Sequence, residues 1–128
     1  MPKVATAFFA VGTIFILAGM CLGEYMGATE NFVLAPVHAH INLLGWATMA
    51  LYGTFYALTK DRYSPRLAWT NFILSTAGVV VMVLALAELF DTGNHATFGP
   101  VLGFAGGLAL AGLLVFLVSV FRELLRPA

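Results

Sequence analysis

Four long apolar runs, separated by short polar breaks, dominate the chain. They extend roughly over residues 4–26, 37–58, 67–89 and 101–121. A helix needs about 20 apolar residues to cross the hydrocarbon core of a bilayer, and each run meets that length. The runs are continuous rather than alternating, which favours helices over the strands of a membrane barrel. The pattern therefore predicts an all-α membrane protein, with residues 1–128 forming a single domain that is an up-down bundle of four transmembrane helices.

The breaks between the runs contain residues typical of turns. Pro36 closes the first break, Pro65 lies in the second, and Gly99 with Pro100 closes the third. Proline is tolerated in the first turn of a helix, where its missing N–H leaves no bond unmade. We therefore expect His95 to lie in the third loop and the last helix to begin after it.

Composition supports a membrane location. The chain is 61% hydrophobic and only 9% charged, whereas soluble domains have about 25% charged residues. A soluble fold of this length could not cover so much apolar surface, so the lipid bilayer is the expected partner of the chain. No phosphate-binding loop, catalytic triad or basic patch for nucleic acid is visible.

The charges are divided between the two sides of the predicted bundle. With four helices, the termini share one side with the middle break, and that side carries every Lys and Arg: Lys3, Lys60, Arg62, Arg66, Arg122 and Arg126. The other side carries Glu24, Glu30, Glu88 and Asp91. Because positive loops stay in the cytoplasm, we expect cytoplasmic termini in a bacterial inner membrane.

The first run is expected to stay on the protein as a membrane helix. It is longer than the roughly 7–15 apolar residues of a secretory signal peptide. Met20 is also too large for the position before a lipoprotein cysteine, here Cys21. Because Cys21 is the only cysteine, the chain has no intrachain disulfide and no cysteine-based zinc framework.

All three histidines fall on the predicted periplasmic side, which makes that side the candidate functional site. His38 and His40 open the second helix, and His95 lies near the start of the fourth. Imidazole is the commonest metal ligand in proteins, and two histidines with a further donor suit copper, zinc or haem iron. On an ideal helix, His38 and His40 point about 200° apart, so they converge only if the first turn is distorted.

Small residues form stripes along three of the predicted helices. His38, Asn42, Gly45, Met49 and Gly53 share one face of the second helix, which we expect to contact protein or a cofactor rather than lipid. The first helix has Gly12, Gly19 and Gly23 on one face, and the fourth has Gly99, Gly103, Gly107 and Ala111. Such stripes indicate close helix packing, or alternatively room for a flat macrocycle.

The stretch His40-Ile41-Asn42-Leu43-Leu44, at the start of a helix, resembles the second membrane helix of the catalytic subunits of haem-copper oxidases and nitric oxide reductases. The resemblance covers about the stretch from His38 to Tyr56. It implies that His40 is an axial ligand of a low-spin haem b. It leaves His95, His38 or a histidine of another copy as the second ligand, with Asn42 as a supporting hydrogen-bonding group.

The chain departs from that family in ways that limit its function. The catalytic subunits need histidine ligands for a copper ion and two haems and have many more helices, whereas this chain has three histidines. It is therefore not a complete oxygen or nitric oxide reductase on its own. The first hypothesis is a small b-type cytochrome or haem-binding subunit with a role in electron transfer.

Two further hypotheses stay open. One is a haem-free site for copper or another transition metal, with His38, His40 and His95 as ligands and with Glu24, Glu88 or Met20 completing the set. The other is a non-catalytic subunit or assembly module of a larger membrane complex. In each case we expect association into a homo-oligomer or a membrane complex, because four short helices bury little surface and carry small-residue stripes.

Overall fold

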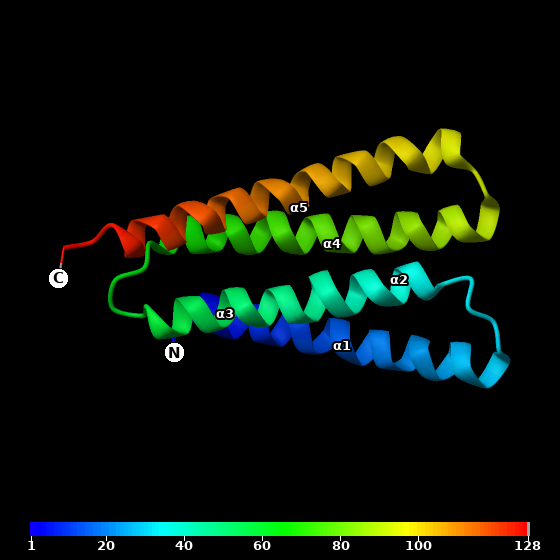
Figure 1. Cartoon of the computed structure of the whole chain (residues 1–128), viewed down its shortest axis with the longest axis horizontal. Coiled ribbons are helices and arrows are strands. Elements are labelled where there is room, and N and C mark those ends of the chain that lie inside the picture. The colour runs from blue at the N-terminus through cyan, green and yellow to red at the C-terminus, as the bar shows by residue number, and fades with distance from the viewer. Residues whose placement is uncertain (128) are drawn as a thin grey trace.

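The computed structural model describes residues 1–127, and its regular elements are helices. In chain order they are α1 (Lys3–Thr29), α2 (Ala35–His40), η1 (Ile41–Thr48), α3 (Met49–Leu58), α4 (Pro65–Thr92) and α5 (His95–Leu124). The prediction of an all-helical protein is confirmed. The helices run along the long axis of the molecule, and both termini lie at the same end (Figure 1).

Three of these helices, α1, α4 and α5, are long and apolar enough to cross a membrane. They correspond to the first, third and fourth apolar runs of the sequence, and they indicate a membrane protein. The second run is also helical, but it is divided into α2, η1 and α3. Its middle part, η1, is an eight-residue π-helix. Short π-helical segments inside longer helices are often found at functional sites.

The last break is shorter than the sequence predicts. Gly93 ends α4 with a φ of 67°, a left-handed conformation that glycine adopts without steric strain. The Asn94 side chain then accepts a hydrogen bond of 3.1 Å from the Thr97 N–H, and this N-cap starts α5. His95 is therefore the first residue of α5, so its predicted position in a loop was wrong. Pro100 lies inside the helix, at the cost of one backbone hydrogen bond.

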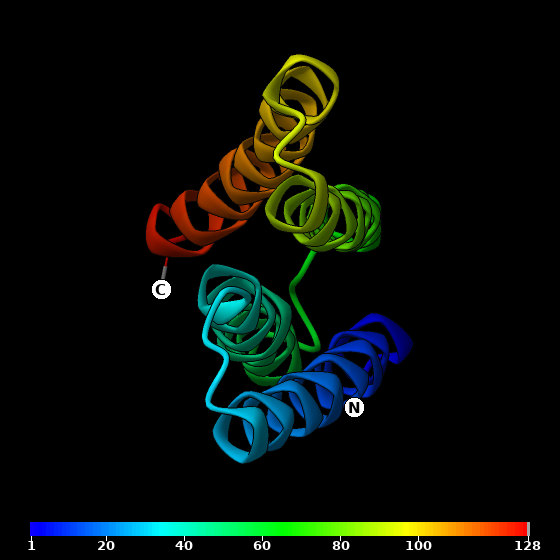
Figure 2. The ribbon, with the colours of Figure 1, turned by 90° about the vertical axis from the view of Figure 1, so that its right-hand side faces the viewer.

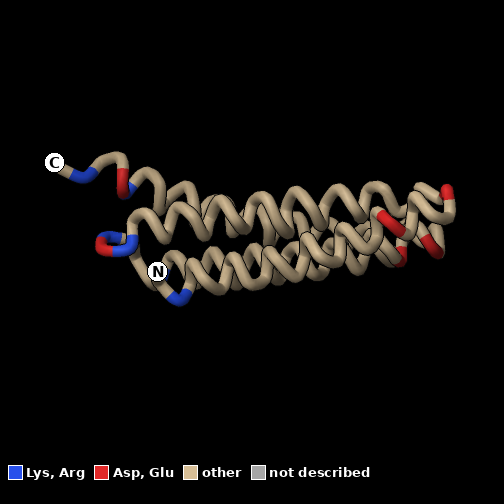
Figure 3. Tube along the Cα trace, turned by 90° about the horizontal axis from the view of Figure 1, so that it is seen from below, with Lys and Arg blue, Asp and Glu red and all other residues tan. Residues whose placement is uncertain are grey.

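The charged residues lie at the two ends of the molecule, with an apolar middle (Figure 3). Lys and Arg lie at the end that holds the termini. At the opposite end, α1 and α4 carry Glu24, Glu88 and Asp91, and Glu30 follows α1. Here we call this acidic end, which also holds α2 and the start of α5, the outer end.

The helices pack in two hairpins. In one, α1 lies against η1 and α3, and in the other α4 lies against α5. At the outer end, α4 lies between the start of α5 and the other helices (Figure 2). Toward its other end α5 comes close to α3, where the Phe116 and Tyr52 rings have centroids 4.4 Å apart. The first half of α5 therefore packs mainly on α4.

A buried polar network joins α3, α4 and α5 within the apolar core. Asn71 is fully buried, and its amide donates a hydrogen bond of 3.3 Å to the Tyr56 hydroxyl. The Ser75 hydroxyl donates to the Asn71 carbonyl oxygen at 2.9 Å, and Tyr56 is 3.2 Å from the Ser119 hydroxyl. Because buried polar groups need partners, these bonds fix the register of the three helices.

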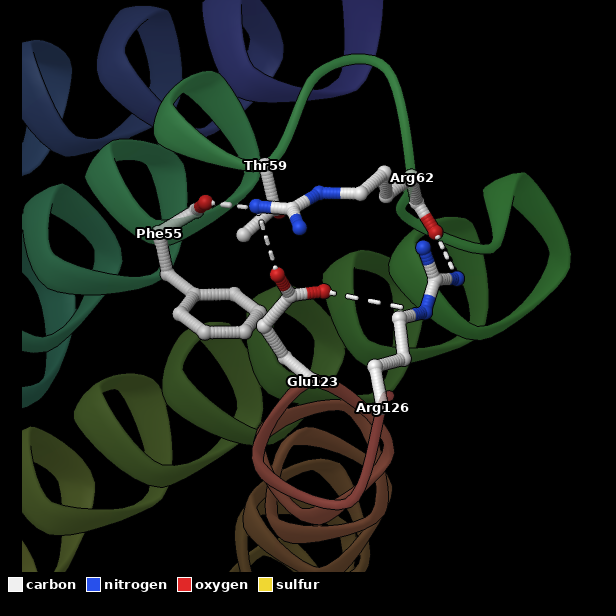
Figure 4. Close-up of polar contacts among 5 residues, drawn as sticks. All are labelled: Phe55, Thr59, Arg62, Glu123 and Arg126. Atoms are coloured by element: carbon white, nitrogen blue, oxygen red, sulfur yellow. Dashed lines mark hydrogen bonds and ion pairs between the residues drawn. The ribbon is translucent and has the colours of Figure 1, made fainter. Parts of the chain in front are cut away.

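At the end that holds the termini, ion pairs connect the α3–α4 loop to α5 (Figure 4). Glu123 pairs with Arg62 at 2.9 Å and with Arg126 at 3.9 Å, and Arg126 also donates to the Arg62 carbonyl oxygen. Arg62 is 59% exposed. Ion pairs this exposed contribute only about 0–1 kcal/mol to stability, so their main effect is to orient the loop.

Candidate functional site

His38 lies against α1, and both of its ring nitrogens have hydrogen-bond partners. Its Nδ1 is 2.8 Å from the carbonyl oxygen of Gly19, and its Nε2 is 3.1 Å from the amide nitrogen of Asn42. A carbonyl oxygen only accepts hydrogen bonds, so Nδ1 carries the proton, and Nε2 then accepts a bond from the amide. In this arrangement His38 has no free lone pair to offer a metal ion.

Two glycines of α1 make room for this contact. A Cβ atom on Gly19 would overlap the Oδ1 atom of Asn42, and one on Gly23 would lie 3.0 Å from Cε1 of His38. By contrast, a Cβ on Gly27 would meet nothing within 4 Å. The glycines of α1 thus allow close approach of a neighbouring helix, and the stripe that begins at His38 contacts protein rather than lipid.

His40 is bound differently, although it lies only two residues from His38. Its Nδ1 is 2.7 Å from the Pro36 carbonyl oxygen of its own helix, so Nδ1 again carries the proton. Its Nε2 has no hydrogen-bond partner among residues 1–127. Metal-binding histidines typically donate one ring N–H to a carboxylate or backbone carbonyl and keep the other nitrogen for the metal. His40 has this form.

The imidazole of His40 lies in a shallow open groove of about 240 Å³ on the flank of α2 and η1. The other residues that line the groove are Ala39, Leu43 and Leu44. Leu43 is 63% exposed, so the groove opens to the surroundings of the chain. A half-buried imidazole whose Nε2 has no hydrogen-bond partner is chemically able to ligate a transition metal ion, the iron of a porphyrin included.

The remaining predicted ligands do not lie together. His95 is exposed at the start of α5, and that part of α5 lies on the far side of α4 from α2 (Figure 2). Met20 and Glu24 are exposed on α1. Glu88 lines a separate groove between the ends of α1 and α4. Within residues 1–127, no group of three or more His, Cys, Asp or Glu side chains could hold a metal ion.

Asn42 lies beside His38 and not beside His40. Its amide nitrogen contacts Nε2 of His38, whereas its Oδ1 atom is buried without a hydrogen-bond partner. In this position Asn42 orients the imidazole that faces α1. The group that orients His40 is the Pro36 carbonyl, which sequence reasoning missed. The four-residue spacing from Pro36 to His40 on a helix could have indicated it.

The glycines of α5 have no such neighbours. A Cβ atom on Gly99, Gly103 or Gly107 would meet nothing within 4 Å. Further along α5, Gly112 does face another helix, because a Cβ there would lie 3.1 Å from the backbone nitrogen of Ser75. The first half of α5 therefore has a small-residue face that the described part of the chain leaves uncovered.

No protein-family model, curated protein or solved structure matches this chain. The resemblance of His40–Leu44 to the haem-binding helix of haem-copper oxidases therefore stays a prediction.

Substitution of Gly19 by alanine tests the contact between α1 and α2. The added methyl group would overlap Asn42, and overpacking of this kind typically costs about 1–3 kcal/mol. We expect Gly19→Ala to lower the midpoint of thermal unfolding in detergent, measured by circular dichroism. Gly27→Ala, on the same helix, is the control and should be neutral or slightly stabilising. A Gly19→Ala protein at least as stable as the control would contradict the contact.

Proposed function

We propose that this chain is a small membrane haem-binding protein, similar to a b-type cytochrome, with His40 as an axial ligand. The observation that carries the proposal is the state of His40. Its Nδ1–H is bound to the Pro36 carbonyl, its Nε2 has no hydrogen-bond partner among residues 1–127, and its side chain lines an apolar groove.

The residues of the groove suit a haem. Ala39 is small enough to let a flat ring approach the helix, and Leu43 and Leu44 offer apolar contacts to its faces and edges. The Pro36 carbonyl accepts the Nδ1 proton, which fixes the tautomer of His40 and makes Nε2 a better ligand. When bound, the haem iron supplies reversible one-electron transfer, so the role would be electron transfer within the membrane.

Replacement of each of the two neighbouring histidines by alanine tests this assignment. We expect His40→Ala to abolish the Soret absorbance of protein produced with ample haem, because the iron loses its ligand. His38→Ala is the matched variant. It should keep the haem but lower stability, because it leaves the Gly19 carbonyl and Asn42 without a partner, at a cost of about 1–3 kcal/mol.

The measurements are visible spectra of the oxidised and the dithionite-reduced proteins, with circular dichroism to compare folding. A wild-type protein without any Soret band would contradict haem binding. Loss of haem from His38→Ala but not from His40→Ala would show that the ligand is assigned to the wrong histidine.

We also propose that the helices form an up-down bundle of four transmembrane segments, with both termini in the cytoplasm of a bacterial cell. The support is the position of all Lys and Arg at the end that holds the termini, since cytoplasmic loops carry the excess of these residues. A fluorescent protein fused to the C-terminus should then fluoresce, and alkaline phosphatase inserted after Gly93 should be active. The reverse pair of results would contradict the orientation.

One observation favours a second candidate function, that of a subunit in a larger membrane complex. The uncovered glycines of α5 would let a helix of another membrane protein approach closely. We expect Gly103→Leu to remove any larger complex that survives purification in mild detergent. Leu113→Ile, an exposed position on the same helix, is the control. Native mass spectrometry would detect the loss, and equal complex formation by both variants would argue against this surface.

A further inference from the structure

We infer that the second axial ligand of the haem is His40 of a second copy of this chain, so that two copies share one haem. This inference rests on the proposed haem-binding function. It adds that the site is incomplete in a single chain, because one chain supplies only one ligand and covers only one side of the macrocycle.

The described part of the chain has no second histidine in a position to bind the same iron. Both ring nitrogens of His38 are already hydrogen-bonded, to Gly19 and Asn42. His95 begins α5, which at that end is separated from α2 by α4 (Figure 2). A low-spin haem with two imidazole ligands therefore needs a histidine from outside this chain.

The groove around His40 is also too small and too open for a complete site. It measures about 240 Å³ and is lined by four residues of one helical segment. Sites for small molecules and cofactors usually measure about 300–1,000 Å³ and bury most of the surface of their ligand. One groove can cover only one face of the haem, and a second surface must cover the other.

A second copy fits that requirement. A two-fold symmetric contact places the same patch of each chain opposite itself, so it brings a second His40 and a second apolar groove to the uncovered face. The segment from Phe32 to Leu58 contains no Lys, Arg, Asp or Glu. Two copies can therefore approach along it in lipid without bringing like charges together.

The small side chain of Ala39 on the same flank would let the two backbones approach each other. Ala39 lies beside His40 in the groove, and it is exposed. Each His40 would project from α2 toward the shared iron, held by its own Pro36 carbonyl. The apolar residues Leu43 and Leu44 of the two copies would lie against the edges of the ring.

The experiment measures the number of haems per chain and the spin state of the iron. It then repeats these measurements on a dimer made from one wild-type and one variant chain, called the mixed pair. Wild-type protein in mild detergent should contain one haem for every two chains, run as a dimer in native mass spectrometry, and give the electron paramagnetic resonance spectrum of a six-coordinate low-spin haem. His95→Ala and Met20→Leu, which change the other candidate donors, should leave all three results unchanged.

The mixed pair is made from two copies with different affinity tags, one wild type and one His40→Gly, purified through both tags. It should hold a five-coordinate high-spin haem, and added imidazole should restore the low-spin spectrum by filling the vacated ligand position. Rescue by imidazole also shows that the variant is folded.

Two results would overturn the inference, and they differ. A low-spin haem bound to single chains at one haem per chain, and lost from His95→Ala, would leave haem binding intact but place the second ligand within the chain. Absence of haem from the wild-type protein would overturn the proposed function as well.

Discussion

The hydrogen bond from His38 to the Gly19 carbonyl determines how α2 is rotated about its own axis. It requires α1 and α2 to lie very close together, which Gly19 and Gly23 allow because they have no side chains. Once His38 is fixed against α1, His40 must point to a different side of the helix, about 200° away. The His38–Gly19 contact thus decides which histidine packs between the helices and which one keeps a free ring nitrogen.

The same contact explains why the outer end does not form a metal cluster. His38 is used for packing, His95 begins a helix on the far side of α4, and the acidic side chains are exposed on α1 and α4. What remains is one imidazole in an apolar groove beside the π-helix η1. One imidazole per chain suits the haem proposed above, whose iron already has four nitrogen ligands, better than it suits a bare metal ion.

Sequence patterns predict much of the fold. Hydropathy gives the helices because lipid requires long, continuous apolar segments whose backbone groups bond within the segment. The distribution of Lys and Arg among the termini and the breaks predicts that they lie at one end of the molecule. The spacing of the glycines identifies the contact face of α1. The start of α5 was missed because the N-cap formed by Asn94 outweighs the helix-disfavouring effect of Pro100. No pattern indicated the π-helix η1. The state of His38 could not be predicted, because it depends on the carbonyl of Gly19, which is distant in sequence.

The central claim is that Nε2 of His40 is free whereas Nε2 of His38 is occupied. Nitrogen-15 nuclear magnetic resonance of the haem-free protein, labelled at histidine, tests it most directly. In both rings Nδ1 should carry a proton, which the carbonyl oxygen of Gly19 or Pro36 accepts. Addition of gallium protoporphyrin, a diamagnetic analogue of haem, should shift the Nε2 resonance of His40 and leave that of His38 unchanged. A shift at His38, or no shift at either histidine, would contradict the assignment.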